Sequence, residues 1–332
     1  MSAPRIAIVG ATGAVGKELL RVLADREFPM RSLKLLASPR SAGTRITHAG
    51  EDHIVAAIDE HSFQDVDLAF FSAGSSTSLQ YVPKAVAAGC TVIDNSSAYR
   101  LDADVPLVVP EVNRTAIAQH QGILANPNCS TIILVLALAP LHHKAGLQSV
   151  VVSTYQAASG AGQRAMDELH ESTRAALAGE QPTQPDALPQ TLAFNLFPHV
   201  DAFMGDGFTK EEDKMLFEVR KILHLPSLNI DATCVRVPVA RCHSESVSVQ
   251  LEHPLTVADA QDLFAAAPGM ELVDQPDANR YPMPRDYAGR EEVAVGRVRL
   301  GRAFRPGLTF WLVGDQLKKG AALNAVQIAE AL

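Results

Sequence analysis

The chain is poor in the features that mark secreted, membrane or nucleic-acid-binding proteins. Only 4 of its 332 residues are cysteine, which is too few for a disulfide framework in a chain of this length. Its longest apolar stretch, residues 131–141, is about half as long as a bilayer-spanning helix. Asp and Glu (37) outnumber Lys and Arg (29), and no basic run offsets the acidic excess. Neither a membrane nor a nucleic acid is therefore expected as a partner.

The N-terminus also lacks a secretory signal, because the strand-like run Arg5–Val9 begins where a basic region and a long apolar region would stand. We therefore expect a soluble, cytoplasmic protein. Hydrophobic residues make up 47% of the chain, enough for packed cores, and the length fits two domains.

Short apolar runs alternate with helical patterns in the first half of the chain. Strands are predicted at five places: Arg5–Val9, Leu33–Ala37, Val66–Ser72, Thr91–Asp94 and Leu107–Val109. Helices are predicted at Ala14–Asp25 and Val82–Ala88, where apolar residues recur at helical spacing. This alternation is typical of a parallel α/β sheet with helices on both faces.

The pattern changes after about residue 128. The sequence predicts helices at 131–141, 161–178, 211–223 and 321–332, and a loop at 180–189. Period-two alternation predicts strands at 149–155, 235–239, 246–251, 293–300 and 308–313. Strands of this kind bury one face only, which indicates an α+β domain with a mostly antiparallel sheet.

A glycine-rich segment, Gly10-Ala-Thr-Gly13-Ala-Val-Gly16, joins the first predicted strand to the first helix. Glycines at this junction let the backbone approach a pyrophosphate, and the helix N-terminus attracts its charge. The alternative is a turn that only packs the helix on the sheet. After the second strand comes Ser38-Pro-Arg40-Ser41, with no acid to hold a ribose hydroxyl. Arg40 and the serines favour NADP, although Arg40 could also be a solvated loop residue.

Cys129 lies in Asn126-Pro-Asn-Cys129-Ser-Thr131, just before an apolar helix. A cysteine at a helix N-terminus feels the helix dipole, which favours the thiolate, and the helix amides can stabilise an oxyanion. A lone cysteine can equally be a small buried hydrophobic residue. His243, next to Cys242, could be its base or a structural histidine. A zinc site from Cys234, Cys242 and His243 lacks the usual close spacing, and no metal is expected.

Taken together, these motifs resemble the aspartate-semialdehyde dehydrogenase family over nearly the whole length. The most specific are Asn126 to Thr131, Cys234-Val-Arg-Val-Pro238 and Arg241-Cys-His-Ser244. The others, in family order, are Gly10 to Gly16, Ser72-Ala-Gly-Ser-Ser76, Asp94-Asn-Ser-Ser97, Val109-Pro-Glu-Val-Asn113 and Gly314-Asp-Gln-Leu317.

The resemblance implies a Rossmann-like NADP-binding domain with a parallel sheet, and an α+β catalytic and dimerisation domain with a mixed, mostly antiparallel sheet. The expected boundaries are residues 1–128, completed by the C-terminal segment 315–332, and residues 129–314. It also implies a homodimer or a dimer of dimers.

The implied reaction is the reversible NADPH-dependent reduction of 4-phospho-L-aspartate to L-aspartate-4-semialdehyde and phosphate, in the biosynthesis of lysine through diaminopimelate, and of methionine, threonine and isoleucine. By resemblance, Cys129 forms an acyl-thioester, His243 is the acid/base and Gln156 positions the substrate. Substrate-binding residues would be Arg236 for the α-carboxylate, Glu211 for the amino group, Arg100 and Lys214 for the phosphate, and Asn128. Without the family, a surface ion pair would be the favoured interpretation of Arg236.

The resemblance assigns NADP contacts to residues in both halves of the chain. They are Gly10, Thr12, Gly13, Ala14, Val15, Arg40, Ser41, Ser72, Gly74, Asn95, Ser159, Gly160 and Gln316. Two other functions stay open at this point. One is N-acetyl-γ-glutamyl-phosphate reductase, whose cysteine follows Asn-Pro-Gly where this chain has Asn128. The other is a non-catalytic NADP-binding paralogue, against which the presence of Cys129 and His243 argues.

Overall fold

A computed structural model describes residues 3–332 and divides the chain into two compact units. Unit 1 contains the residues up to Asn128 together with Ala321–Leu332, and unit 2 is Cys129–Gly320. The chain thus returns to unit 1 after residue 320, whereas residues 315–332 were expected to return.

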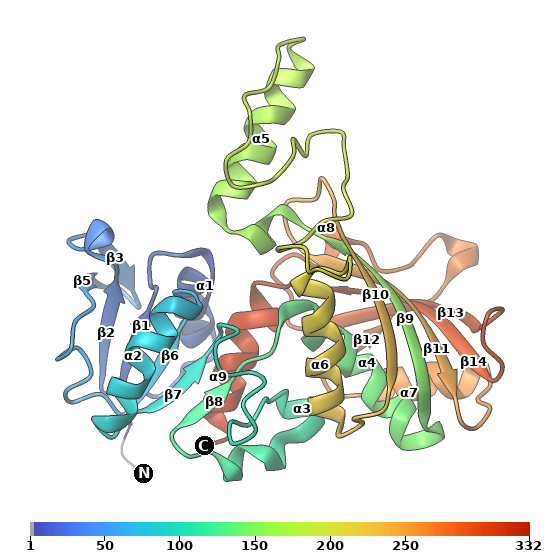
Figure 1. Cartoon of the computed structure of the whole chain (residues 1–332), viewed down its shortest axis with the longest axis horizontal. Coiled ribbons are helices and arrows are strands. Elements are labelled where there is room, and N and C mark those ends of the chain that lie inside the picture. Colours follow the sequence, from blue (N-terminus) through green and yellow to red (C-terminus); the bar gives the residue numbers. More distant parts are fainter. Residues whose placement is uncertain (1–2) are drawn as a thin grey trace. The chain divides into compact units, whose positions relative to one another are not determined.

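Unit 1 is built on a six-stranded sheet with the order β5-β2-β1-β6-β7-β8, in which every pairing is parallel (Figure 1). Parallel strands are buried on both faces, which explains their continuous apolar sequences. The strands are β1 (Arg5–Val9), β2 (Ser32–Ala37), β5 (Ala56–Ala57), β6 (Leu68–Phe71), β7 (Thr91–Asp94) and β8 (Ile123–Ala125). A small hairpin, β3 (Arg45–His48) and β4 (Glu51–Ile54), forms a separate two-stranded sheet.

The C-terminal helix completes the core of unit 1. In α9 (Leu323–Glu330), Leu323, Val326 and Ile328 join the same buried apolar cluster as residues of β1 and α1. An ion pair of 2.7 Å between Arg26 Nε and Glu330 Oε1 lies where α1 ends. The helical segments of unit 1 are α1 (Ala14–Asp25), α2 (Ser75–Ala87), α3 (Pro110–Asn113), α9 and two short 3-10 segments, Pro39–Ser41 and Arg114–Gln119.

The prediction of a strand at Leu107–Val109 is wrong. Leu107–Val109 forms only an isolated bridge, between Leu107 and Ala125. Pro110 begins α3 immediately afterwards, and the Val109 N–H donates to Asn113 Oδ1 at 2.9 Å rather than to a ladder. The last strand of the sheet is instead the three-residue β8, which is too short to show a period.

Unit 2 contains a six-stranded mixed sheet with the order β10-β9-β11-β14-β13-β12. The β9–β10 and β12–β13 pairs are parallel, and the other three pairs are antiparallel. The strands are β9 (Leu147–Gln156), β10 (Asn229–Arg236), β11 (His243–Leu251), β12 (Met270–Leu272), β13 (Val293–Leu300) and β14 (Gly307–Gly314). The parallel sheet of unit 1 and the mixed sheet of unit 2 confirm the predicted fold class.

The most apolar helix of the chain, α4 (Cys129–Ala145), packs on this sheet. It is buried around most of its circumference, so its sequence shows no polar stripe. The helices of unit 2 are α4, α5 (Gln163–Leu177), α6 (Lys210–Leu223), α7 (Val257–Ala266) and α8 (Pro284–Tyr287), with 3-10 segments at Ala158–Ala161 and Pro276–Ala278 and a π-helical turn at Lys318–Ala322. Figure 1 shows α5 and the segment after it projecting away from the sheet of unit 2.

The predicted strand at Val235–Val239 is displaced in the structure. Strand β10 begins at Asn229 and ends at Arg236, and the chain then turns towards β11. The strand starts in the polar segment Asn229–Thr233, which the apolar pattern did not mark. The expected loop is longer than 180–189, because residues 178–209 form turns and isolated bridges.

Within residues 3–332, no helix is both long enough and apolar enough to cross a membrane.

Candidate active site

Four expected NADP-binding segments of unit 1 follow neighbouring strands of its parallel sheet. They come after β1 (Gly10 to Val15), β2 (Arg40 and Ser41), β6 (Ser72 and Gly74) and β7 (Asn95). Because the four strands are adjacent in the order β2-β1-β6-β7 and all parallel, these segments share the carboxyl edge of the sheet. Ligands of open parallel sheets bind at this edge.

The turn after β1 depends on its glycines. Gly10 has φ +89°, and a Cβ there would lie 2.8 Å from the backbone carbon and oxygen of Ser72. A Cβ on Gly16 would lie 2.2 Å from the Gly10 carbonyl oxygen. Because the backbone of this turn lies so close to its neighbours, only glycine fits at both positions. Helix α1 begins within the turn, at Ala14.

Hydrogen bonds to the main chain fix several polar side chains at this edge. The Ser72 hydroxyl donates to the Val9 carbonyl at 3.0 Å, and the Asn95 amide donates to the Phe71 carbonyl at 3.1 Å. Arg100 is buried, and its guanidinium donates to the carbonyls of Asn95 (2.8 Å) and Asn126 (2.9 Å). These two hydrogen bonds of Arg100 hold the turns after β7 and β8. Arg40, by contrast, is exposed.

In unit 2, Cys129 is the first residue of α4 and is partly exposed. The other three cysteines are buried. A Cβ on Gly320 would lie 2.9 Å from the Cβ of Cys129, so the backbone of the π-helical turn lies directly against the cysteine. The expected helix N-terminal position of this thiol is therefore present. Asn128, which is buried, directly precedes it.

Three further candidates meet at one edge of the mixed sheet. Gln156 and Arg236 are the last residues of the parallel strands β9 and β10, and they are paired in register. His243 is the first residue of β11, which runs antiparallel to β9, so it lies at the same edge. All three side chains are buried: Gln156 is 1%, Arg236 5% and His243 0% exposed.

The ring of His243 lies between two nitrogen atoms. The backbone N–H of Ala157 donates to Nδ1 at 3.0 Å, and the Gln156 amide nitrogen is 3.4 Å from Nε2. Burial, together with the Arg236 charge, lowers the pKa of His243 to about 3, although Glu211 and the Cys242 backbone act in the opposite direction. The imidazole is therefore neutral at physiological pH.

Charged residues of α6 complete this arrangement. Gln156 donates to Glu211 Oε1 at 3.0 Å, and Lys214 contacts Glu211 Oε2 at 3.0 Å and Asp201 at 2.6 Å. Burial acts to lower the pKa of Lys214, but the carboxylates of Glu211 and Asp201 outweigh it and raise the pKa. Lys214 thus lies between the carboxyl groups of Glu211 and Asp201, which stabilise its ammonium form.

Arg236 is a buried cation, which rules out a surface ion pair. Its Nη1 donates to the Ala157 carbonyl at 2.7 Å, and its Nε has no hydrogen-bond partner among the described residues. Burial lowers the pKa of Arg236, while Glu211 and Cys129 act to raise it. The cation thus lies within electrostatic reach of the Cys129 thiol and has donor capacity left for an anion.

The second glycine turn lies beside these groups. A Cβ on Gly160 would be 3.0 Å from both Arg236 Nη1 and His243 Cε1. The Gln316 amide donates to the Ser159 hydroxyl and accepts from the Cys242 N–H at 2.9 Å. Ser159, Gly160 and Gln316, which were expected to bind NADP, therefore line the same part of unit 2 as His243.

Sequence reasoning did not identify four groups at this site. They are the Thr154 hydroxyl, which donates to Gln156 Oε1 at 3.1 Å, the Ala157 N–H, Gly320 and Glu245. Glu245 lies two residues after His243 in β11, is fully buried, and has neither carboxyl oxygen hydrogen-bonded. Burial raises the pKa of Glu245 well above its ordinary value, so it is a neutral acid. Its position in an alternating polar strand, Ser244-Glu245-Ser246, gave no signal of burial.

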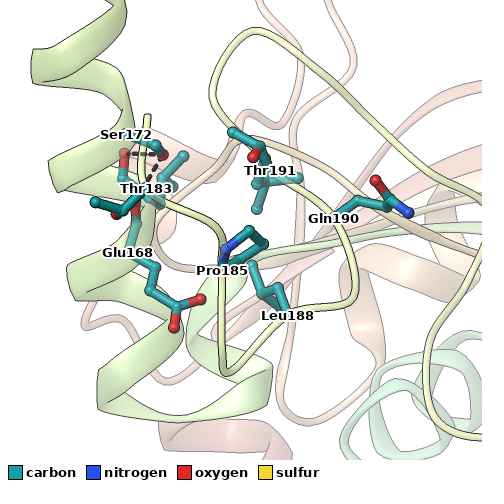
Figure 2. A pocket seen from close by; sticks show the side chains of 9 residues that line it. Glu168, Ser172, Thr183, Pro185, Leu188, Gln190 and Thr191 are labelled. Carbon is teal, nitrogen blue, oxygen red and sulfur yellow. Dashed lines mark hydrogen bonds between the residues drawn. The ribbon is translucent and has the colours of Figure 1, made fainter. Parts of the chain in front are cut away.

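A pocket between α5 and the segment after it lies elsewhere in unit 2 (Figure 2). Its lining includes Glu168, Ser172, Thr183, Pro185 and Leu188. The Ser172 hydroxyl donates to the Glu168 carbonyl at 2.6 Å, a bond within the helix. None of the expected catalytic or binding residues lines this pocket, so it is not the candidate active site.

Two family models match consecutive parts of the chain. Residues 5–120 match the semialdehyde dehydrogenase NAD binding domain, and residues 138–319 match the semialdehyde dehydrogenase dimerisation domain.

Known proteins match the chain over nearly its whole length. Aspartate-semialdehyde dehydrogenase from Aquifex aeolicus is 51% identical over 99% of this chain and 97% of its own length. The crystal structure of aspartate semialdehyde dehydrogenase II complexed with ASA, from Vibrio cholerae, has a TM-score of 0.97 at 43% identity, and the match covers 100% of this chain and 98% of that one. The enzyme from Candida albicans, in a structure with NADP, has a TM-score of 0.77 at 25% identity, over 100% and 98% of the two chains.

Proposed function

We propose the function of this chain from one premise: it belongs to the aspartate-semialdehyde dehydrogenase family, whose members it matches over nearly its full length. It is an NADP-dependent, phosphorylating oxidoreductase that interconverts 4-phospho-L-aspartate with L-aspartate-4-semialdehyde and phosphate. It serves amino-acid biosynthesis from aspartate. N-acetyl-γ-glutamyl-phosphate reductase is not favoured, because the matched relatives carry the other name.

The observation that carries the chemistry is the position of Cys129 at the N-terminus of α4 within reach of the buried Arg236 cation. Cys129 is proposed as the nucleophile, since a helix N-terminus and a nearby cation both favour a thiolate. The thiolate attacks the carbonyl carbon of the acyl phosphate, the bond to the phosphate oxygen breaks, and an acyl-thioester remains. His243 is proposed to act beside the reacting carbon, in the place where the resemblance puts an acid/base group.

Substrate recognition is proposed for the charged groups around this centre. Arg236 has an unpartnered Nε and a rigid fork suited to an α-carboxylate. Glu211 carries the negative charge that an α-ammonium group needs, and Gln156 links it to His243. Lys214 and Arg100 are proposed for the phosphate, and Asn128 for a neighbouring polar contact. Arg100 would have to exchange or share its carbonyl partners to do so.

The carboxyl edge of the unit 1 sheet fits a dinucleotide. Gly10 lets the turn after β1 lie against the backbone of Ser72, where a Cβ would clash, and Arg40 follows β2 where an acid would select NAD. NADP supplies or accepts the hydride when it is bound. Gly10, Thr12, Gly13, Ala14 and Val15 are proposed to hold the pyrophosphate. Contacts to the rest of the cofactor are proposed for Arg40, Ser41, Ser72, Gly74, Asn95, Ser159, Gly160 and Gln316.

A homodimer is proposed on the match to the dimerisation domain model. Assembly into a dimer of dimers and a location in the cytoplasm stay predictions.

A substrate comparison tests the proposed function. NADP reduction is followed by absorbance with phosphate and either L-aspartate-4-semialdehyde or N-acetyl-glutamate semialdehyde. We expect activity only with the first and only when phosphate is present. Activity only with the second would overturn the assignment of Glu211 to an amino group. NADP binding without activity on either would favour the non-catalytic paralogue.

A further inference from the structure

The hydrogen bond between Ala157 and His243 fixes where the histidine can carry a proton. A backbone N–H can only donate, and the Ala157 N–H lies 3.0 Å from Nδ1. Nδ1 must therefore use its lone pair as the acceptor. A neutral imidazole has one N–H, so the proton of His243 is on Nε2.

Gln156 does not offer Nε2 an acceptor. Its amide nitrogen donates to Glu211 Oε1 at 3.0 Å, and its oxygen accepts from the Thr154 hydroxyl at 3.1 Å. Reversing the amide would place its oxygen against the Glu211 carboxylate. The nitrogen is thus the Gln156 atom that faces Nε2, at 3.4 Å, and two donors confront each other. The Nε2 proton is left for a group that arrives with the substrate.

The charges around the ring oppose a second proton. Arg236 of β10 and the ring both pack against Gly160, and burial and the Arg236 charge lower the pKa of His243. Glu211 of α6 and the Cys242 backbone of the preceding turn oppose this, but do not restore the ordinary pKa. Glu245, on the same strand, is neutral because burial raises its pKa. An imidazolium would also have to place a proton on Nδ1, against the Ala157 N–H.

We propose that His243 acts as a neutral hydrogen-bond donor through Nε2, and that Arg236 and the N-terminus of α4, not an imidazolium, balance the charge of the Cys129 thiolate. This inference rests on the proposed function of Cys129 as the nucleophile. It makes Ala157, Gln156 and Thr154 positioning residues, because they set the tautomer and leave Nε2–H directed at the reacting group.

The acyl-transfer step balances without a second proton on His243. The thiolate sulfur bonds to the acyl carbon, and the carbonyl oxygen becomes an oxyanion that accepts the Nε2–H bond. The carbon–oxygen bond to phosphate then breaks, and the electron pair leaves with the phosphate. The thioester is neutral, and the released phosphate takes one proton from solvent. A donor held in place in a dry site is the arrangement that stabilises such an oxyanion.

Titration of Cys129 separates this proposal from a thiolate–imidazolium pair. The rate of alkylation by iodoacetamide is measured against pH without substrate or cofactor, and it reports Cys129 because the other three cysteines are buried. In His243→Gln, we expect the pKa of Cys129 to change by less than about half a pH unit. Loss of an imidazolium partner would instead raise it by about one to three units. That rise would overturn the proposal.

Two further variants complete the titration. Arg236→Gln is expected to raise the pKa of Cys129 by about one unit or more, because it removes the proposed counter-charge. An unchanged pKa would overturn that half of the proposal. His143→Gln is the matched control: His143 is exposed in the last turn of α4, at the other end of the helix from Cys129. It should leave the titration as in the unmodified protein.

Nitrogen-15 NMR of the unmodified chain tests the tautomer directly. The His243 signals, assigned by their loss in His243→Gln, should show a protonated Nε2 and an unprotonated Nδ1 from pH 8 down to pH 5. A protonated Nδ1, or protonation of both nitrogens near pH 6.5, would overturn the proposal. Neither measurement uses turnover, so failure here is distinguishable from failure of the substrate assay.

Discussion

The two sheet edges that carry the expected site residues differ in the kinds of groups that they present and in how far these groups are buried. At the carboxyl edge of the unit 1 sheet, the important groups are main-chain atoms, glycines and exposed side chains such as Arg40. At the edge of the unit 2 sheet, they are the buried side chains of Gln156, Arg236, His243 and Glu211, which lie close to one another. An open edge allows a cofactor to bind and leave, whereas a buried cluster strengthens each charge and dipole acting on a reacting group.

The two edges also differ in what holds them in place. In unit 1, Ser72 and Asn95 bond to backbone carbonyls of the strands beside them. In unit 2, each side chain depends on the next, from Thr154 to Gln156 to Glu211 to Lys214. Substitutions at the first edge should therefore change cofactor affinity alone. Substitutions at the second should change chemistry, often through a neighbour.

The largest effect is expected for Cys129→Ala, which removes the proposed nucleophile. Turnover should fall by at least about 10⁴-fold, as when a catalytic nucleophile is lost in other enzymes. NADP affinity, measured by fluorescence titration, should stay within about twofold because the proposed pyrophosphate contacts lie in unit 1. Retained turnover would show that another group performs the chemistry.

Arg236→Lys separates charge from shape at the unit 2 edge. Lysine keeps the positive charge but loses the fork that binds a carboxylate through two bonds. We expect kcat/KM for 4-phospho-L-aspartate to fall about 100-fold, the loss of about 3 kcal/mol of charge-assisted hydrogen bonding. The alkylation profile of Cys129 should change little. If kcat/KM is unchanged, Arg236 does not bind the α-carboxylate.

Gly10→Ala tests whether the unit 1 edge works through its backbone. Position 10 has a positive φ, and a Cβ there would also clash with the backbone of Ser72. The turn would have to shift, so NADP affinity should fall by about tenfold. Gly50→Ala is the control, since Gly50 has φ +85° and nothing within 4 Å of its Cβ. It carries the backbone strain without the contact and should bind NADP normally. Equal losses in both variants would point to general destabilisation.

Arg40→Ala should change cofactor choice more than activity. Losing one exposed charge on the 2′-phosphate should lower kcat/KM with NADPH by about fivefold, near 1 kcal/mol, and leave NADH unaffected. Arg114→Ala, another exposed arginine of unit 1, should change neither value. A parallel loss with both cofactors would remove Arg40 from 2′-phosphate recognition.

The smallest effect concerns stability and comes from Glu245. Because its pKa is raised in the folded protein, the unfolded chain releases this proton first as pH rises. Its contribution is therefore lost progressively above the ordinary carboxyl pKa. Glu245→Gln should raise Tm relative to the unmodified chain by about 2–4 °C at pH 8, and by less at pH 5. Glu51→Gln, at an exposed position, should show no such pH-dependent difference.

Local signals in the sequence predicted unit 1 better than unit 2. The glycine turn and the absence of an acid after β2 each lie within one contiguous segment, as does Cys129 before the apolar helix in unit 2. The Ala157 N–H, Gly320 and buried Glu245 belong to the site only because distant strands bring them together. The family resemblance supplied Gln156, Glu211 and Lys214, whose own segments carry no local sign of a site.

The prediction of secondary structure was wrong at two strands for related reasons. Leu107–Val109 has an apolar strand sequence, but Pro110 starts a helix and leaves it with one bridge. The first half of strand β10 alternates exposed Asn229, Asp231 and Thr233 with the less exposed Ile230 and Ala232, so only one of its faces is apolar. In both segments, pairing with distant parts of the chain decided where a strand forms, and the local sequence alone did not show it.

The most direct test of the central claim is to trap the acyl-enzyme. The chain is incubated with 4-phospho-L-aspartate without NADPH, quenched in acid and analysed by mass spectrometry, beside Cys129→Ser. The account predicts one aspartyl group in the unmodified chain, on the peptide that contains Cys129, and no thioester in the variant. No adduct, or an adduct on another residue, would contradict it.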